Sequence, residues 1–293
     1  MRRSMLFLPG NTPNMLINGS CLGADAVIFD LEDAVAPTEK DAARVLVRNT
    51  MRHMDFRGCE TIVRINSIDT PYWKEDLDEV LPQRPDLILL PKTNCAADVE
   101  AADDYITLVE QRLGFASNTV GLMPLIETAL GVENAYSIAS ARSRVAALFL
   151  GAEDLTADLQ CQRTKEGREI DYARHRLVVA ARAANVAVYD TPFTDVNDDE
   201  GIRTDAAYAK ALGFTGKAAI SPRHVEVINQ VFSPTLKDIR YAFEVMDAIT
   251  LAKEQGRGAI ALHGKMIDAP IVARARQTLD MARQLGIGRE DLQ

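Results

Sequence analysis

The chain has 293 residues, of which 47% are hydrophobic and 26% charged, so it can bury a large core and does not have the composition of a disordered protein. Its 33 basic and 42 acidic residues give a net charge of −9, which opposes nonspecific binding to nucleic acid. No run of about 18 apolar residues occurs, so no membrane-spanning helix is predicted.

The first residues include two arginines and then a five-residue apolar stretch, Met5 to Pro9, which is too short for the apolar region of a signal peptide. The cysteines show no spacing typical of a metal clip or a redox motif. Together these features predict a cytoplasmic protein with reduced thiols. The cysteines are Cys21, Cys59, Cys95 and Cys161.

Short runs rich in Val, Ile, Leu and Phe alternate with longer amphipathic stretches, the pattern of βα units around a parallel sheet. The predicted strands are Ser4–Leu8, Ala26–Asp30, Thr61–Ile65, Leu87–Leu90, Val120–Ile126, Val145–Leu150, Ala187–Tyr189 and Lys217–Ile220. The predicted helices between them include Thr38–Met51, Ala96–Leu113, Ile170–Asn185 and Glu200–Leu212. Eight units in about 230 residues predict an α/β protein with a (β/α)₈ TIM barrel over residues 1–232. A doubly wound open sheet is the alternative, but the first strand lacks the Gly-x-Gly-x-x-Gly turn of a dinucleotide site.

From residue 233 the pattern changes. Ser233-Pro234-Thr235 is typical of a helix start and predicts a helix to about Gln255. A segment with Gly256, Gly258 and Gly264 then leads to a last helix, from about Asp268 to Leu285. Residues 233–293 therefore form a C-terminal helical extension outside the barrel count. We expect it to pack on the barrel or on a neighbouring subunit, which favours a homo-oligomer.

Catalytic side chains in this fold lie at the carboxyl ends of the strands. The period of two in the third strand turns Ile62, Arg64 and Asn66 toward the barrel axis. An inward arginine keeps its charge, so it requires either an ion pair with Asp30 or Glu32 or an anionic ligand such as a substrate carboxylate.

Two neighbouring apolar strands each run into an acid, Glu127 in one and Asp154, after Glu153, in the other. Each acid precedes a helical stretch, where it could act as a cap or complement the helix dipole. Near an inward Arg64, the pair also fits two oxygen ligands of Mg²⁺. A zinc site is disfavoured, because none of the four histidines has ligand spacing with another His or Cys.

Lys92 follows the fourth strand, where it could form a Schiff base or an ion pair with an acid at a strand end. Asp268 stands just before Ala269-Pro270, an ordinary N-cap arrangement. From the residues alone, the ion pair is the favoured interpretation of Lys92 and the cap is the favoured interpretation of Asp268.

Several motifs follow one another along nearly the whole chain: Arg3-Ser4-Met5-Leu6-Phe7-Leu8-Pro9-Gly10, Phe29-Asp30-Leu31-Glu32-Asp33-Ala34-Val35, Val63-Arg64-Ile65-Asn66, Leu90-Pro91-Lys92, Ile126-Glu127, Gly151-Ala152-Glu153-Asp154 and Gly264-Lys265-Met266-Ile267-Asp268. In this order and spacing they resemble the HpcH/HpaI aldolase family, which contains the citrate lyase β subunit and the malyl-, citramalyl- and β-methylmalyl-CoA lyases.

The resemblance implies a barrel that assembles as a homotrimer or hexamer, with Mg²⁺ bound by Glu127 and Asp154. It also implies that Arg64 grips the substrate carboxylate, with Glu127 beside the substrate, and that Asp268 reaches the active site of a neighbouring subunit. Asp268 is then the candidate for proton relay. Supporting residues around the metal and substrate would be Asp30, Glu32 and Lys92.

The activity implied is a carbon–carbon lyase acting on a 3-hydroxyacyl thioester, in the first place a citryl thioester cleaved to oxaloacetate and an acetyl thioester. The thioester could be on CoA or on an acyl-carrier protein, and citrate lyase α and γ subunits would be partners. One alternative is a citramalyl-CoA or malyl-CoA lyase that uses free CoA thioesters. Others are a non-catalytic scaffold subunit of a lyase complex and a phosphoenolpyruvate-handling barrel, although the strand ends offer few cations for a phosphate.

Overall fold

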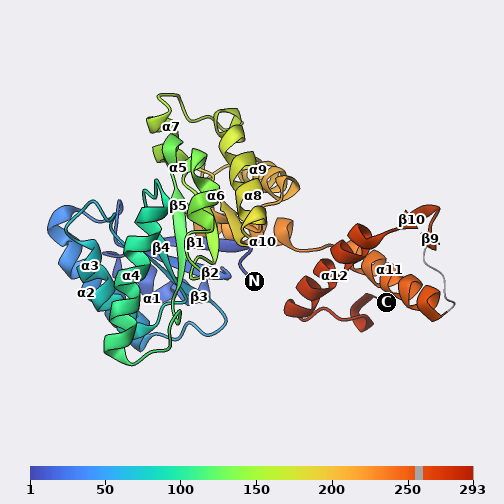
Figure 1. Ribbon diagram of the computed structural model, residues 1–293, viewed down its shortest axis with the longest axis horizontal. Helices are drawn as coiled ribbons and strands as arrows, with labels where there is room; N and C mark the ends of the chain where they lie inside the picture. Colours follow the sequence, from blue (N-terminus) through green and yellow to red (C-terminus); the bar gives the residue numbers. More distant parts are fainter. Residues whose placement is uncertain (255–259, 293) are drawn as a thin grey trace. The chain divides into compact units, whose positions relative to one another are not determined.

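The computed structural model describes residues 1–254 and 260–292 (Figure 1). The chain divides into two compact units, a barrel unit of Arg2–Gln230 and a C-terminal unit of Val231–Gln293 to which Met1 also belongs. No helix in the described part of the chain is long and apolar enough to cross a bilayer.

The barrel unit is built on eight parallel strands that pair in chain order and close where β8 pairs with β1, which confirms the predicted (β/α)₈ TIM barrel. All the predicted strands are present, with ends that differ by up to a few residues. They are β1 (Ser4–Pro9), β2 (Ala26–Asp30), β3 (Glu60–Arg64), β4 (Leu87–Leu90), β5 (Gly121–Ile126), β6 (Ala147–Leu150), β7 (Ala187–Asp190) and β8 (Gly216–Ala219).

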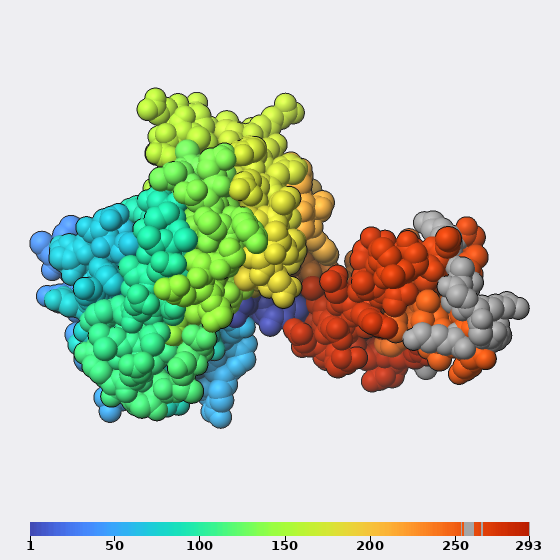
Figure 2. All heavy atoms as spheres, in the orientation of Figure 1, coloured from blue at the N-terminus to red at the C-terminus, as the bar shows by residue number. Residues whose placement is uncertain are grey.

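Helices surround the strands, and on one face of this unit the side chains of α4, α6 and α8 form a continuous surface (Figure 2). The helices are α1 (Pro13–Asn18), α2 (Lys40–His53), α3 (Trp73–Val80), α4 (Ala96–Leu113), α5 (Ala129–Glu133), α6 (Ala135–Ala139), α7 (Ala152–Asp158), α8 (Asp171–Ala183), α9 (Asp199–Leu212) and α10 (Pro222–Phe232), whose end belongs to the C-terminal unit. Short 3₁₀ turns occupy Gly19–Cys21, Pro37–Glu39, Leu81–Gln83, Arg168–Ile170 and Glu290–Leu292.

The barrel interior is filled by alternate residues of the strands. In β4, Leu87 and Leu89 enter this core, while the intervening Ile88 and the last residue, Leu90, are also fully buried. Burial on both faces explains why the strands read as continuous apolar runs. Each such side chain contributes roughly 1.5–3 kcal/mol of burial free energy. Inward-facing members of the core are Met5, Ala26, Ile28, Ile62, Met123, Leu125, Ala147, Phe149, Tyr189 and Ala218.

Four buried charges hold β7 and β8 against α8 and α9. Nη2 of Arg174 lies 2.8 Å from Asp190 and 2.7 Å from Asp205, and Nζ of Lys217 lies 2.6 Å from each of the same two carboxylates. Lys217 also donates a hydrogen bond of 2.6 Å to the carbonyl of Thr191. Because a buried charge requires a partner, this network fixes the backbone that continues from β7 into Thr191.

The C-terminal unit consists of two long helices and a hairpin: α11 (Leu236–Glu254), β9 (Ile260–Leu262), β10 (Lys265–Ile267) and α12 (Ala269–Gln284). Val245 of α11, Ile267 of β10 and Ala275 of α12 share one small apolar core. The hairpin was not predicted. Its two turn residues, His263 and Gly264, have φ of +48° and +75°, as in the two-residue turns that suit antiparallel strands.

Both predicted helices of this extension are confirmed, with α11 ending at Glu254. Three residues of the predicted segment, Gln255, Gly256 and Gly258, lie outside the described residues.

Candidate functional site

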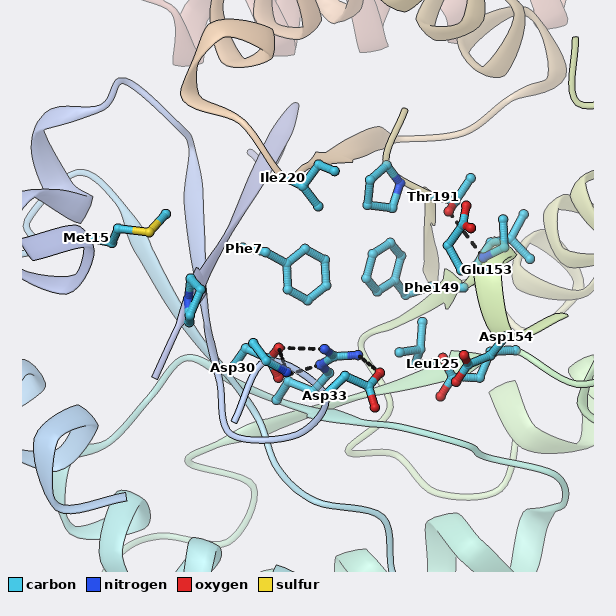
Figure 3. A pocket seen from close by; sticks show the side chains of 18 residues that line it. Phe7, Met15, Asp30, Asp33, Leu125, Phe149, Glu153, Asp154, Thr191 and Ile220 are labelled. Carbon is cyan, nitrogen blue, oxygen red and sulfur yellow. Dashed lines mark hydrogen bonds and ion pairs between the residues drawn. The ribbon is translucent and has the colours of Figure 1, made fainter. Parts of the chain in front are cut away.

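A cavity of about 450 Å³ opens at the carboxyl ends of the barrel strands. In the view of Figure 3, Asp30, Asp33 and Asp154 lie along one side, Ile220 lies on the other, and Phe7 and Phe149 lie between them. The cavity thus has a charged wall, formed by these acids and Arg64, and an apolar wall that includes Phe7 and Phe149. Its lining is Phe7, Pro9, Met15, Asp30, Asp33, Ala34, Arg64, Leu125, Glu127, Phe149, Leu150, Gly151, Ala152, Glu153, Asp154, Thr191, Pro192 and Ile220.

Arg64, the last residue of β3, lines the cavity and is held by carboxylates. Its Nε and Nη2 donate to the two oxygens of Asp30 at 2.7 and 2.6 Å, a bidentate pair. Its Nη1 lies 3.0 Å from Glu32 and 3.3 Å from Asp33. Burial by itself would lower the pKa of Arg64, but Asp30, Glu32 and Asp33 raise it above its usual value. Arg64 thus makes the predicted ion pairs with Asp30 and Glu32.

One of the inward orientations predicted from this strand, that of Asn66, is wrong. Ile62 faces the barrel core as expected, but Asn66 does not face the axis. Its side-chain amide donates to Asp76 of α3 at 2.7 Å, in the layer between β3 and the helices. The alternation fails there because β3 ends at Arg64, so Asn66 already belongs to a loop.

Lys92 and Glu32 form an ion pair beside Arg64. Nζ of Lys92 lies 2.8 Å from Glu32 and 3.8 Å from both Asp33 and Asp154. The Glu32 contacts to Arg64 and Lys92 are ion pairs by distance, although their angles fall outside hydrogen-bond geometry. Burial would lower the pKa of Lys92, but Glu32 and the other acids raise it. A protonated ammonium is not a nucleophile, so this arrangement favours the ion pair over a Schiff base.

Glu127, directly after β5, is a buried carboxylate. It is 3% exposed, and Oε1 accepts a hydrogen bond of 2.6 Å from the backbone N–H of Lys92. Among the described residues, no Lys, Arg or His lies within ion-pair distance of it. Burial, then the charges of Glu32 and Asp154, raise the pKa of Glu127 to about 8. Such a carboxylate is stabilised by any cation that enters the cavity.

Neither Glu127 nor Asp154 makes a helix-cap hydrogen bond. The residue that caps α5 is Thr128, whose hydroxyl accepts from the N–H of Gly131 at 3.0 Å, so Glu127 is not a cap. Asp154 lies in the first turn of α7, where the dipole favours it, but it makes no cap hydrogen bond. Its side chain is 43% exposed and lines the same cavity as Glu127.

Negative charge is in excess at this site. Its charged side chains are Asp30, Glu32, Asp33, Glu127, Glu153, Asp154, Arg64 and Lys92. When all are ionised, six negative and two positive charges leave an excess of four negative charges. No group of three or more His, Cys, Asp or Glu in residues 1–254 and 260–292 is arranged to enclose a metal ion. Two carboxylates with open positions suit Mg²⁺, which keeps waters and binds substrate oxygens.

The apolar wall was missed by the sequence interpretation. Phe7 of β1 and Phe149 of β6 stack with ring centroids 6.0 Å apart and an interplanar angle of 24°. The guanidinium of Arg64 lies 5.2 Å from the centroid of the Phe7 ring, a cation–π contact. Thr191 lies beside this wall, and its hydroxyl accepts from the N–H of Ala152 at 3.2 Å. Inward alternation along β1 and β6 could have identified both rings.

Glu153 also lines the cavity, but it is exposed, and its carboxylate lies 3.5 Å from Nε of Arg163. Asp268 belongs to the C-terminal unit, where its Oδ1 accepts the N–H of Ile271 at 3.1 Å and caps α12. The N-cap interpretation of Asp268 is thus confirmed.

The chain is similar in sequence to a protein family and to known lyases. The family model described as HpcH/HpaI aldolase/citrate lyase matches residues 3–222. The chain is 43% identical over 282 residues to the citrate lyase subunit beta of Leuconostoc mesenteroides subsp. cremoris, covering 96% of this chain and 93% of that one. It is 35% identical over 303 residues to the L-malyl-CoA/beta-methylmalyl-CoA lyase of Cereibacter sphaeroides (strain ATCC 17025 / ATH 2.4.3), covering 97% and 95%.

A solved structure is also similar. CitE from Mycobacterium tuberculosis, in complex with magnesium, acetoacetate and coenzyme A, superposes with a TM-score of 0.77 at 30% identity. The match covers 96% of this chain and 98% of that chain.

Proposed function

This chain belongs to the HpcH/HpaI aldolase/citrate lyase family, and we propose that it is a Mg²⁺-dependent carbon–carbon lyase that cleaves a citryl thioester to oxaloacetate and an acetyl thioester. The observation that carries the proposal is the buried Glu127, which has no ion-pair partner among the described residues and lies beside Asp154 in a cavity that also holds Arg64. The 43% identity to a citrate lyase subunit beta supports the citryl group as the substrate.

Glu127 and Asp154 would hold the Mg²⁺ ion, since they supply carboxylate oxygens at a site with excess negative charge. When bound, Mg²⁺ supplies Lewis-acid chemistry, which lowers the pKa of a substrate hydroxyl and stabilises a developing keto acid. The solved relative that contains magnesium supports this choice of ion.

Arg64 would bind the substrate carboxylate through Nη1. Its pair with Asp30 uses Nε and Nη2 and is nearly inaccessible to solvent, so we expect that pair to remain. The Nη1 contact to Asp33 is long, at 3.3 Å, and Asp33 is 54% exposed. An incoming carboxylate can therefore displace Asp33 without breaking the bidentate pair. In the transition state the same guanidinium offsets the charge on the forming keto acid.

The cleavage itself breaks the bond between the second and third carbons of the 3-hydroxyacyl thioester. The hydroxyl loses its proton, the electron pair of the broken bond moves to the thioester fragment as an enolate, and protonation at carbon gives the acetyl thioester. The apolar wall of Phe7 and Phe149 would exclude water around that enolate. Asp268 of a neighbouring copy in a homotrimer or hexamer would relay the proton. That role also gives the C-terminal unit a function in the active site.

The decisive measurement compares the cleavage of citryl-CoA, citramalyl-CoA and malyl-CoA in Mg²⁺ and in EDTA. We expect citryl-CoA to be cleaved fastest, only with Mg²⁺, and E127A and D154A to lose activity. E153A is the matched control, because Glu153 is a neighbouring exposed acid paired with Arg163. Full metal-dependent activity in both E127A and D154A would show that these two residues are not the ligands.

A second candidate is a lyase for malyl- or citramalyl-CoA, favoured by the 35% identity to the malyl-CoA/methylmalyl-CoA lyase. Neither substrate has the second free carboxylate of a citryl thioester, and the apolar wall would suit a hydrogen or methyl group in its place. The same assay decides between the two candidates. Repeating it with a citryl-loaded carrier protein, and with citrate lyase α and γ subunits added, tests the thiol carrier and the complex. A scaffold role would require no activity under all of these conditions.

A further inference from the structure

Lys40 is a buried lysine at a position where its charge does not stabilise its own helix. It is the first residue of α2, where the helix dipole disfavours a positive charge, and it is 7% exposed. Its ammonium group makes no ion pair with a carboxylate of the described residues. Instead Nζ donates two hydrogen bonds of 2.7 Å, to the carbonyls of Leu31 and Glu32. A buried ammonium that bonds only carbonyls is costly, and such costs are concentrated at functional sites.

The two carbonyls belong to the loop that follows β2 and carries Glu32 and Asp33. On its other side this loop is fastened by Asp30, whose carboxylate accepts the N–H of Glu32 at 2.9 Å and that of Ala34 at 3.3 Å. Lys40 thus binds carbonyl groups of this short segment, and Asp30 binds its N–H groups. The result is a Glu32 carboxylate held between the cations of Arg64 and Lys92.

Lys40 also changes the charge at the site. Six carboxylates, Arg64 and Lys92 leave four excess negative charges, and Lys40 reduces the excess to three. One bound divalent cation then leaves a single excess negative charge, where the same site without Lys40 would keep two. Lys40 therefore lowers the repulsion that an anionic hydroxy acid meets once the metal is bound.

We propose that Lys40 is a positioning residue of the lyase site: through the carbonyls of Leu31 and Glu32 it fixes the acidic loop around Arg64, and its charge sets the balance between metal and substrate affinity. This inference rests on the proposed function, namely Mg²⁺ at Glu127 and Asp154 and a carboxylate at Arg64.

Removing the charge of Lys40 should have an effect that the loss of its structural contacts alone would not have. Loss of a cation near the site favours Mg²⁺ and disfavours the anionic substrate, so the two affinities change in opposite directions. In K40M we expect Mg²⁺, titrated alone by calorimetry, to bind about threefold more tightly. We expect oxaloacetate, titrated in saturating Mg²⁺, to bind about tenfold more weakly, and the KM for citryl-CoA to rise to a similar degree. K40R, which keeps the charge, should retain the wild-type Mg²⁺ affinity.

R48M is the matched control, since Arg48 lies on the same helix in a half-exposed ion pair with Glu79 and should leave both affinities unchanged. Unchanged affinities in K40M, or weakening of both together, would overturn the inference. K40Q replaces K40M if K40M does not fold, with the same expectations, and failure of both to fold would assign Lys40 a purely structural role. Absence of Mg²⁺ binding in the wild type would instead refute the proposed function, whatever Lys40 does.

Discussion

The backbone N–H of Lys92 donates a hydrogen bond of 2.6 Å to Oε1 of Glu127, and Lys92 adopts a left-handed φ of +51° to do so. A side chain other than glycine is strained in that region by roughly 1 kcal/mol. The same residue places its ammonium group beside Glu32. One strained residue therefore orients the buried carboxylate with its backbone and the neighbouring acid with its side chain.

Removing the Lys92 side chain separates these two contributions. K92M and K92G both lose the ammonium, but only K92G relieves the backbone strain. We expect K92G to be more stable than K92M by about 1 kcal/mol in urea unfolding. Both variants should still bind Mg²⁺, because the N–H to Glu127 remains. Equal stability of the two would show that the φ of this residue stores no strain.

The titration of Glu127 predicts the pH dependence of Mg²⁺ binding. Its pKa is raised to about 8 by burial and by Glu32 and Asp154, so in the metal-free protein this group stabilises the fold at low pH. That contribution decreases as the pH rises from the ordinary carboxyl range through about 8. Because Mg²⁺ requires the ionised form, its apparent affinity should fall about tenfold for each pH unit below 8.

This dependence can be measured as the Mg²⁺-induced shift in Tm between pH 6 and 9. The shift should grow with pH in the wild type, and E127Q should show little shift at any pH. A wild-type shift that does not vary with pH would contradict ionisation of Glu127 as the step that limits binding.

Asp268 combines a structural role with the proposed catalytic one, and two substitutions separate them. D268A removes the N-cap of α12 and should destabilise the C-terminal unit by about 1 kcal/mol. D268N keeps a good cap, so its stability should stay within a few tenths of a kcal/mol of the wild type. It cannot relay a proton, however, and we expect its kcat to fall at least a hundredfold.

Mixing variants tests whether Asp268 acts across subunits. E127A and D268N are each expected to be inactive, but a mixed oligomer would contain sites with both residues intact. Activity should therefore appear when the two are unfolded and refolded together. Two batches of D268N treated in the same way are the control, and lack of recovery in the E127A mixture would place Asp268 outside the neighbouring site.

Gly151 makes a further prediction, because an added Cβ would lie 2.8 Å from both Cβ and Oε2 of Glu127. Its φ of −102° suits any residue, so G151A tests space and not backbone strain. We expect G151A to fold but to bind Mg²⁺ at least tenfold more weakly, as measured by calorimetry. Gly131 would be a poor control, since a Cβ there would meet the backbone oxygen of Thr93 at 2.6 Å. Gly23, at φ +74° with open space around it, tests strain alone.

The barrel could be predicted from the sequence because its strands are buried on both faces and appear as short apolar runs between amphipathic helices. The hairpin of β9 and β10 could not, since each strand has only three residues and the loop is defined by two left-handed residues, His263 and Gly264. In the site, the period of two correctly predicted that Arg64 points inward, but it does not predict which groups lie near the guanidinium. Whether its partner is Asp30 or a ligand depends on atoms contributed by other strands. The Phe7 and Phe149 wall was missed for a related reason, because an inward aromatic residue looks the same in a sequence whether it fills a core or lines a cavity.

Gly151 also affects how related chains should be classified. The space that holds the Glu127 carboxyl exists only because the residue between β6 and α7 has no side chain. A relative that keeps Glu127 and Asp154 but has a larger residue at this position would satisfy every test based on ligand identity and still bind the ion more weakly. An inventory of active and degenerate members of the family should therefore score this glycine together with the two acids, since an added side chain, and not a missing ligand, can be the first step by which such a site is lost.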